Sequence, residues 1–185
     1  MRKKLSSKKG MTLFEMLATV IIIALLAAGM STGMSAGMRV YASAEFDSSS
    51  SALAANINTT LTDILRYSSK YTIPTKENSP AYLITNYEYG MEDCYIACYQ
   101  FGSEVTPDAG ETIKVFYWRE NEADARKPKP LVNTGSYGDL RVADFTIAPQ
   151  SDSLGHYFEV SYRIISLVDS TASRDVKTIV RMMNQ

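Results

Sequence analysis

The stretch KKGMTLFEMLATVIIIALLAAGMSTGMSAGM, residues 8–38, decides how this chain is organised. Glu15 is its last charged residue, and Met16 through Met38 carry no charge at all. An α-helix rises about 1.5 Å per residue, so about 20 apolar residues match the hydrocarbon thickness of a bilayer. The stretch therefore predicts one helix that can span a membrane.

The residues before this stretch are strongly basic. Five of the 19 lysines and arginines fall in the first ten positions, at Arg2, Lys3, Lys4, Lys8 and Lys9. Basic flanks stay on the cytoplasmic side of a membrane helix. We therefore expect a single-pass protein of the inner (cytoplasmic) membrane, with its amino terminus inside and everything after Arg39 outside.

Two ordinary processing schemes fit this segment poorly. A secretory signal peptide could be cut at Ala42-Ser43-Ala44, but the strongly apolar run ends near Ala28, which leaves an unusually long interval before that site. A lipoprotein signal needs a cysteine just after the apolar run, whereas the first cysteine is Cys94. A third scheme depends on Gly10 and Glu15.

Lys8-Lys9-Gly10, followed by Met11-Thr12-Leu13-Phe14-Glu15 and the apolar run, resembles the amino-terminal signal of type IV pilins and of type II secretion or competence pseudopilins. In that family a prepilin peptidase cuts after the glycine and methylates the new terminal amine. The resemblance implies a leader of residues 1–10, cleavage after Gly10, and an N-methylated Met11. Many members begin the mature chain with Phe, and Met11 departs from that pattern.

Glu15 stands at the edge of the apolar run, at the fifth position of the implied mature chain. A carboxylate within a bilayer costs about 2.5–3.5 kcal/mol, so Glu15 needs an interfacial position or a partner. In the family's filaments the mature terminal amine, here that of Met11, neutralises this glutamate in the same or a neighbouring subunit. The resemblance thus implies that Glu15 sets subunit register, and the alternative is that it only marks the cytoplasmic edge of a membrane anchor.

Glycine recurs every fourth residue in the second half of the run, at Gly29, Gly33 and Gly37. Small residues at this spacing let helices approach closely in a membrane or filament core. Glycine also lowers helix stability by about 1 kcal/mol relative to alanine, so the same residues favour local unwinding outside lipid. Both interpretations stay open, as does the simple abundance of glycine in membrane helices.

After Arg39 the helical pattern continues with one apolar stripe, which predicts that this part packs against a core. The serines Ser48–Ser51 favour a break or bend, and Pro74 ends the segment, so the spine helix is expected to run from near Met11 to about Ser69. The stripe consists of Leu53, Ile57, Leu61, Ile64 and Leu65.

The rest of the chain has the period of strands. The clearest alternation runs from Phe158 to Ile164 and from Val176 to Met182, with turn residues between them, so these runs predict a hairpin. Short connections favour an antiparallel sheet packed on the spine helix, which is an α+β fold and the pilin fold implied by the resemblance. Weaker strands are expected at residues 82–87, 94–101, 112–118 and 140–148, and surface loops at 126–130 and 133–138.

The globular part offers little chemistry. Cys94 and Cys98 on one strand lie about 13 Å apart, which is too far for a disulfide unless the chain bends, so a disulfide and two packed thiols both remain possible. The acids Glu120, Glu122 and Asp124, or Asp144 with Asp152, could hold a hard cation, although a solvated loop fits them as well. His156 has no catalytic neighbours in sequence.

No nucleic-acid partner is expected. Without the five leader bases the chain keeps 14 of its 19 basic residues against 20 acidic residues, so it has no overall positive charge to hold phosphates. Lys127 and Lys129 alone make a small basic footprint. The tyrosines Tyr87, Tyr89, Tyr95 and Tyr99 suit either strand packing or a contact surface.

Taken together, these patterns predict a structural subunit of a type IV pilus or pseudopilus, not an enzyme, with no cofactor or metal. Its expected partners are other subunits, the prepilin peptidase, a membrane platform with its assembly ATPase, and lipid before assembly. The expected segments are a leader at 1–10, a membrane and filament-core helix at 11–38, an amphipathic half at 39–70, and a β-sheet head at 71–185. The alternative is a membrane-anchored extracellular binding module that does not polymerise.

Overall fold

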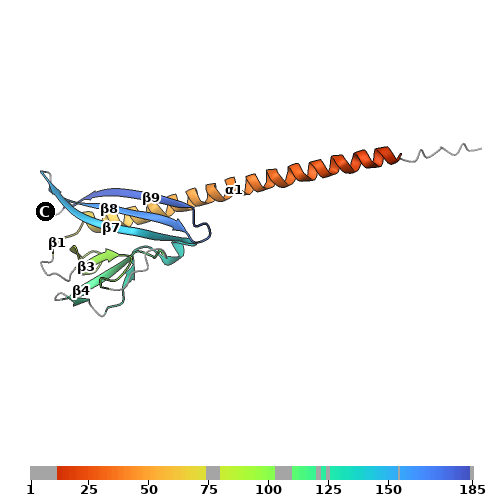
Figure 1. The fold of residues 1–185 in the computed structure, drawn as a ribbon. Helices are drawn as coiled ribbons and strands as arrows, with labels where there is room; N and C mark the ends of the chain where they lie inside the picture. The colour runs from red at the N-terminus through yellow and green to blue at the C-terminus, as the bar shows by residue number, and fades with distance from the viewer. Residues whose placement is uncertain are drawn as a thin grey trace, which may run out of the picture. The chain divides into compact units, whose positions relative to one another are not determined.

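The computed structural model describes residues 12–73, 80–102, 110–119, 122–123, 126–153 and 155–183. The chain divides into two compact units, Met1–Glu45 and Phe46–Gln185. One helix, α1 (Leu13–Arg66), contributes to both (Figure 1). The expected long amino-terminal helix is therefore present.

Within the first unit, α1 buries none of its side chains in the protein. Leu13 and Phe14 are 88% and 78% exposed, and the large apolar residues from Met16 to Tyr41 are exposed as well. An 18-residue window of α1 has a mean hydropathy of 2.3 and none of it is buried, so in length and composition α1 can cross a membrane. Apolar surface of this extent needs lipid or another apolar surface to cover it.

Of the break or bend expected at Ser48–Ser51, the break is wrong, because α1 continues through these serines. The hydroxyls of Ser50 and Ser51 donate to the carbonyl oxygen of Asp47 instead of interrupting the helix. Serine in a helix interior commonly makes this bond one turn back, which removes its competition with the backbone.

The helix ends at Arg66, three residues before the expected end near Ser69. The Met183 N–H donates to the Arg66 carbonyl oxygen (2.9 Å), and the Ser69 N–H donates to the Thr85 carbonyl oxygen (2.9 Å). Backbone partners from the strands therefore replace helical ones at this end.

The second unit contains two antiparallel sheets. The larger sheet has the strand order β1–β2–β3–β4–β5, and β6 also pairs with β4; the smaller sheet has the order β7–β8–β9. The expected terminal hairpin is confirmed as β8 and β9. The strands are β1 (Lys70–Thr72), β2 (Leu83–Asn86), β3 (Met91–Ala97), β4 (Lys114–Arg119), β5 (Glu122–Ala123), β6 (Lys129–Pro130), β7 (Leu140–Asp152), β8 (Gly155–Ser166) and β9 (Ser173–Arg181).

The strands expected in one antiparallel sheet form two sheets. Two smaller expectations are also corrected. Residues 126–130, expected as a loop, include β6, where Lys129 and Pro130 pair with Val115 and Lys114. β7 continues to Asp152, beyond the expected end at 148, because it follows β8 to their shared turn. Within 133–138, Thr134–Ser136 form a short 3-10 helix.

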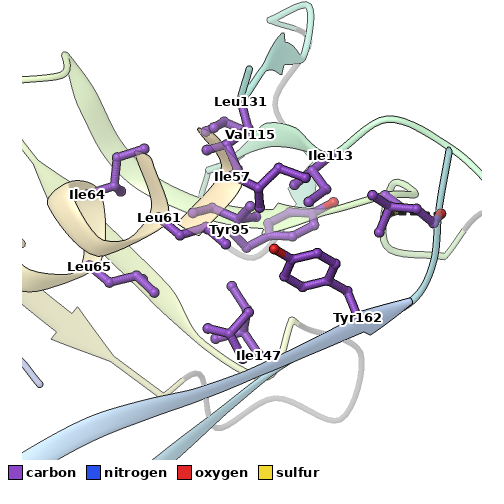
Figure 2. Close-up of a cluster of buried hydrophobic side chains, with 14 of the residues drawn as sticks. Ile57, Leu61, Ile64, Leu65, Tyr95, Ile113, Val115, Leu131, Ile147 and Tyr162 are labelled. Atoms are coloured by element: carbon purple, nitrogen blue, oxygen red, sulfur yellow. Dashed lines mark hydrogen bonds between the residues drawn. The ribbon is translucent and has the colours of Figure 1, made fainter. Parts of the chain in front are cut away.

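The apolar stripe of α1 lies at the centre of the core between the two sheets. Its five residues are each at most 1% exposed. Figure 2 shows Ile57, Leu61, Ile64 and Leu65 meeting Val115 from the larger sheet and Ile147 and Tyr162 from the smaller one. The α+β arrangement is confirmed, and the helix stripe is the surface that both sheets share.

Candidate functional site

The start of α1 is organised by Thr12 and Glu15. The Glu15 carboxylate oxygen Oε2 accepts hydrogen bonds from the Thr12 N–H (2.9 Å) and the Thr12 hydroxyl (3.0 Å). The Glu15 N–H donates in return to Thr12 Oγ1 (3.2 Å). This reciprocal pattern is a capping box, which satisfies backbone donors that a helix otherwise leaves unpaired. Glu15 is therefore held at the first helical turn by its own chain.

The capping role of Thr12 was missed in the sequence analysis. Its signal was present, because a Thr followed three residues later by Glu before an apolar run is the sequence pattern of a capping box. Gly10 and Met11, the expected processing residues, lie outside the described residues. Glu15 is placed four residues after Met11 on the same chain, at the amino end of the exposed apolar helix.

The three glycines of α1 lie on open surface. A Cβ atom built on Gly29, Gly33 or Gly37 would meet nothing within 4 Å. Met30, Met34 and Met38, which follow them, are exposed. Because glycine carries no side chain, this part of α1 offers a second helix a path for close backbone approach.

Three hydroxyl groups in the apolar part of this helix are bonded within the helix itself. Thr19 donates to the Glu15 and Met16 carbonyl oxygens, Thr32 to that of Ala28 (3.1 Å), and Ser35 to that of Ser31 (3.0 Å). Polar groups inside a bilayer need such partners because no water is available there. These bonds make the segment compatible with lipid despite its threonines and serines.

Cys94 and Cys98 are free thiols in the structure, and both are buried. Cys94 Sγ donates to the Glu92 carbonyl oxygen (3.2 Å), whereas Cys98 Sγ lies 3.9 Å from the Val142 carbonyl oxygen of β7. Burial raises the pKa of each thiol to about 12. Thiols of this kind are poor nucleophiles, because the reactive species is the thiolate.

Three acidic side chains of the smaller sheet, Asp144, Asp152 and Asp175, are engaged with arginines. Arg163 bridges Asp144 (3.1 Å) and Asp175 (2.9 Å), and Arg181 holds Asp152 (2.7 Å). A trough of about 350 Å³ is lined by Asp144, Arg163 and Asp175. Among the described residues no group of His, Cys, Asp and Glu side chains could hold a metal ion. The second group of acids expected to hold a cation lies outside the described part of the chain. It consists of Glu120, Asp124 and the side chain of Glu122.

The remaining candidates are divided between core and surface. Tyr95 is 4% exposed and Tyr87 is 71% exposed, so the four clustered tyrosines do not form one surface. The His156 ring lies against the Tyr71 ring, with 5.8 Å between their centroids. Lys127 and Lys129 are exposed. None of these residues forms a catalytic arrangement with a nucleophile in the described part of the chain.

Comparison with known proteins identifies one motif. Residues 5–31 match the prokaryotic N-terminal methylation motif. No curated protein and no solved structure matches the chain. The matched residues contain Gly10, Met11, the capping box and the first half of the apolar helix.

The matched motif and the fold agree with each other. The motif is the signal of type IV pilins and pseudopilins, and it implies processing by a prepilin peptidase. A long apolar amino-terminal helix whose second part packs on antiparallel sheets is a pilin-like architecture. The chain thus combines a type IV pilin-like signal with a pilin-like architecture, and this signal points to a structural subunit.

Proposed function

We propose that this chain is a filament subunit of a type IV pilus or of a type II secretion or competence pseudopilus. It is cut after Gly10, methylated at Met11, held in the inner membrane with its carboxyl end outside, and then polymerised through α1. It performs no catalysis. A membrane platform and a cytoplasmic ATPase supply the work of assembly.

One combination of features carries this proposal. The methylation motif at residues 5–31 overlaps a helix whose apolar side chains from Leu13 to Tyr41 contact no core of their own. A plain anchor explains the exposed apolar surface but not the peptidase signal. A subunit explains both, because the same surface is covered first by lipid and later by other helices.

Glu15 is the proposed assembly residue. Cleavage after Gly10 creates a positively charged amine one residue before Thr12, whose N–H already donates to the Glu15 carboxylate. In the membrane the capping box and this amine stabilise the carboxylate within one chain. During assembly the amine of a neighbouring subunit takes that place, which fixes the axial register. Gly29, Gly33 and Gly37 allow the helices to pack closely.

The first test is the intact mass and amino-terminal sequence of the protein from the membrane fraction of its native host, with and without the prepilin peptidase. We expect a chain that starts at N-methylated Met11 only when the peptidase is present. An intact Met1 in both strains would make the protein an anchored module. A start at Glu45 would make it a secreted protein and exclude a filament.

The second test replaces Glu15. We expect Glu15→Ala to remain membrane-inserted but to abolish filaments recovered by shearing and sedimentation, because the neighbouring amine loses its counter-charge. The matched control is Glu45→Ala, which removes an exposed acid from the same helix outside the charge-free stretch. Normal filament yield from Glu15→Ala would contradict the register role and leave Glu15 as a marker of the cytoplasmic edge of the membrane helix.

A further inference from the structure

One short part of α1 consists of residues that favour other structures. Residues 47–51 read Asp-Ser-Ser-Ser-Ser, and we call them the serine segment. Aspartate and serine are poor helix formers because their side chains compete for the hydrogen bonds of the backbone. Only Ser50 in the segment is buried, and the apolar stripe of α1 begins later, at Leu53. Neither helix propensity nor apolar burial therefore accounts for the helical form of the serine segment.

One arginine of the smaller sheet contacts both ends of the serine segment. Arg174, the second residue of β9, donates from Nη1 to the Asp47 carbonyl oxygen (3.5 Å) and to the Ser51 hydroxyl. These two acceptors lie about one helical turn apart. A single guanidinium group thus holds the first and the last residue of the segment at the separation that a helix requires.

The Ser51 hydroxyl links this contact to the helical backbone. It accepts from Arg174 and donates to the Asp47 carbonyl oxygen (2.5 Å), to which the Ser50 hydroxyl also donates (3.3 Å). Such bonds one turn back slightly destabilise a helix and often bend it. Arg174 keeps the Ser51 hydroxyl in this position. When the guanidinium group leaves, the hydroxyl is again able to compete for other backbone groups.

The next turns on the same face of α1 are attached more firmly. The Tyr162 hydroxyl of β8 donates to Asn58 Oδ1 (2.9 Å) and to the Ala54 carbonyl oxygen (3.4 Å). Positions 47, 51, 54 and 58 share one helix face. Tyr162 is 3% exposed, whereas Arg174 lies at the surface. Because water replaces exposed hydrogen bonds more readily than buried ones, the Arg174 contact is the one that can open.

We infer that the serine segment is a conditional joint in α1, helical while Arg174 holds it and unwound when Arg174 is released. The core from Leu53 onward keeps its structure in both states. Order and disorder of a short segment is a common form of switch. Arg174 follows the β8–β9 turn by two residues, so a displacement of this turn would open the joint. Opening would let the part of α1 before Asp47 change direction. The inference goes beyond the proposed function, because it applies to an anchored module as well as to a filament subunit.

The test is hydrogen exchange of the full-length chain in detergent, read at single amides by mass spectrometry. We expect Arg174→Ala to speed exchange by roughly tenfold or more at residues 48–52 and to leave residues 57–65 unchanged, because only the joint opens. The matched control is Lys177→Ala. Lys177 is another exposed basic residue of β9, but its ion pair is with Glu159 of β8, so this variant should not change exchange in α1.

A second variant tests whether the serines cause the opening. Ser48 and Ser49 are exposed, and alanine is the best helix former, so Ser48→Ala with Ser49→Ala should restore slow exchange in the Arg174→Ala chain. Unchanged exchange in Arg174→Ala would overturn the inference. Equal acceleration at residues 57–65 would also overturn it, since Arg174 would then stabilise the whole unit. Failure of the two alanines to restore protection would show that the serines do not make this part of the helix conditional. None of these outcomes bears on the proposed function.

Discussion

Gly110 lies where the segment before β4 passes close to the smaller sheet. Its φ is +57°, and a Cβ atom there would stand 2.8 Å from both Arg141 Cβ and Ile165 Cδ1. We expect Gly110→Ala to destabilise the second unit by about 1–3 kcal/mol, because it adds left-handed strain to a steric clash. Urea unfolding of the detergent-solubilised chain, followed by the fluorescence of Trp118, measures the loss.

A substitution at Gly138 distinguishes backbone strain from the steric clash as the cause of the lost stability. Its φ is +51°, yet an added Cβ would meet nothing within 4 Å. Gly138→Ala therefore carries the backbone strain without the clash. If both variants lose the same stability, the close approach at Gly110 contributes nothing.

The two cysteines give a second prediction at the residue scale. Burial raises the pKa of Cys94 and of Cys98 to about 12, so almost none of either thiol is ionised at pH 8. We expect a hydrophilic alkylating reagent to leave both unmodified in the native protein and to modify both in urea without a reductant. Mass spectrometry counts the adducts. Modification that appears only after reduction would show that the two are bonded in the cell.

At the scale of elements, the carboxyl end of α1 depends on Asn86. This buried side chain donates to the Ile64 carbonyl oxygen and accepts from two N–H groups of the β2–β3 turn. Asn86→Ala should lower the free energy of unfolding by about 1–3 kcal/mol, because it leaves buried polar groups without partners. The same unfolding assay measures it.

Asn133→Ala is the matched control for this change. Asn133 also accepts a backbone hydrogen bond, from the Gly135 N–H (2.9 Å), but at an exposed position where water can replace it. We expect a clearly smaller loss from Asn133→Ala. Equal losses would mean that burial of Asn86 does not set its contribution.

Some elements could be predicted from sequence because their pattern is local. The alternation from Phe158 to Ile164 fixes which face of β8 is buried, and the helical stripe from Leu53 to Leu65 fixes the packed face of α1. The division into two sheets could not be predicted, since it depends on which distant strands pair. The serines at 48–51 led to a wrong prediction because a serine hydroxyl can either compete with the helical backbone or donate to a carbonyl oxygen one turn back. Ser50 and Ser51 do the latter, with Asp47 as the acceptor.

Part of the candidate site could also be predicted from the sequence, and part could not. Glu15 could be found because one carboxylate beside a charge-free run is conspicuous in sequence. The pairing of Arg163 with Asp144 and Asp175 could not, because these three residues come together only when β7, β8 and β9 lie side by side.

For the whole molecule, the core belongs entirely to the second unit. We expect residues 46–185 alone to be soluble, monomeric and cooperatively folded, because they keep the apolar stripe of α1. Residues 71–185 should aggregate, because both sheets then lose the surface they share. Circular dichroism and sedimentation distinguish the outcomes. Soluble, folded 71–185 would show that the sheets need no helix.

The uninterrupted backbone of α1 also has a mechanical consequence. A filament under tension would load this helix along its axis, and its turns differ in strength. Residues 53–65 pack between the two sheets, whereas residues 29–37 are exposed throughout, and each of their three glycines lowers helix stability by about 1 kcal/mol relative to alanine. We expect these nine residues to stretch first, and fully extended they would gain roughly 16 Å of length. In a filament, this glycine-containing segment would then be the part of α1 that lengthens under load.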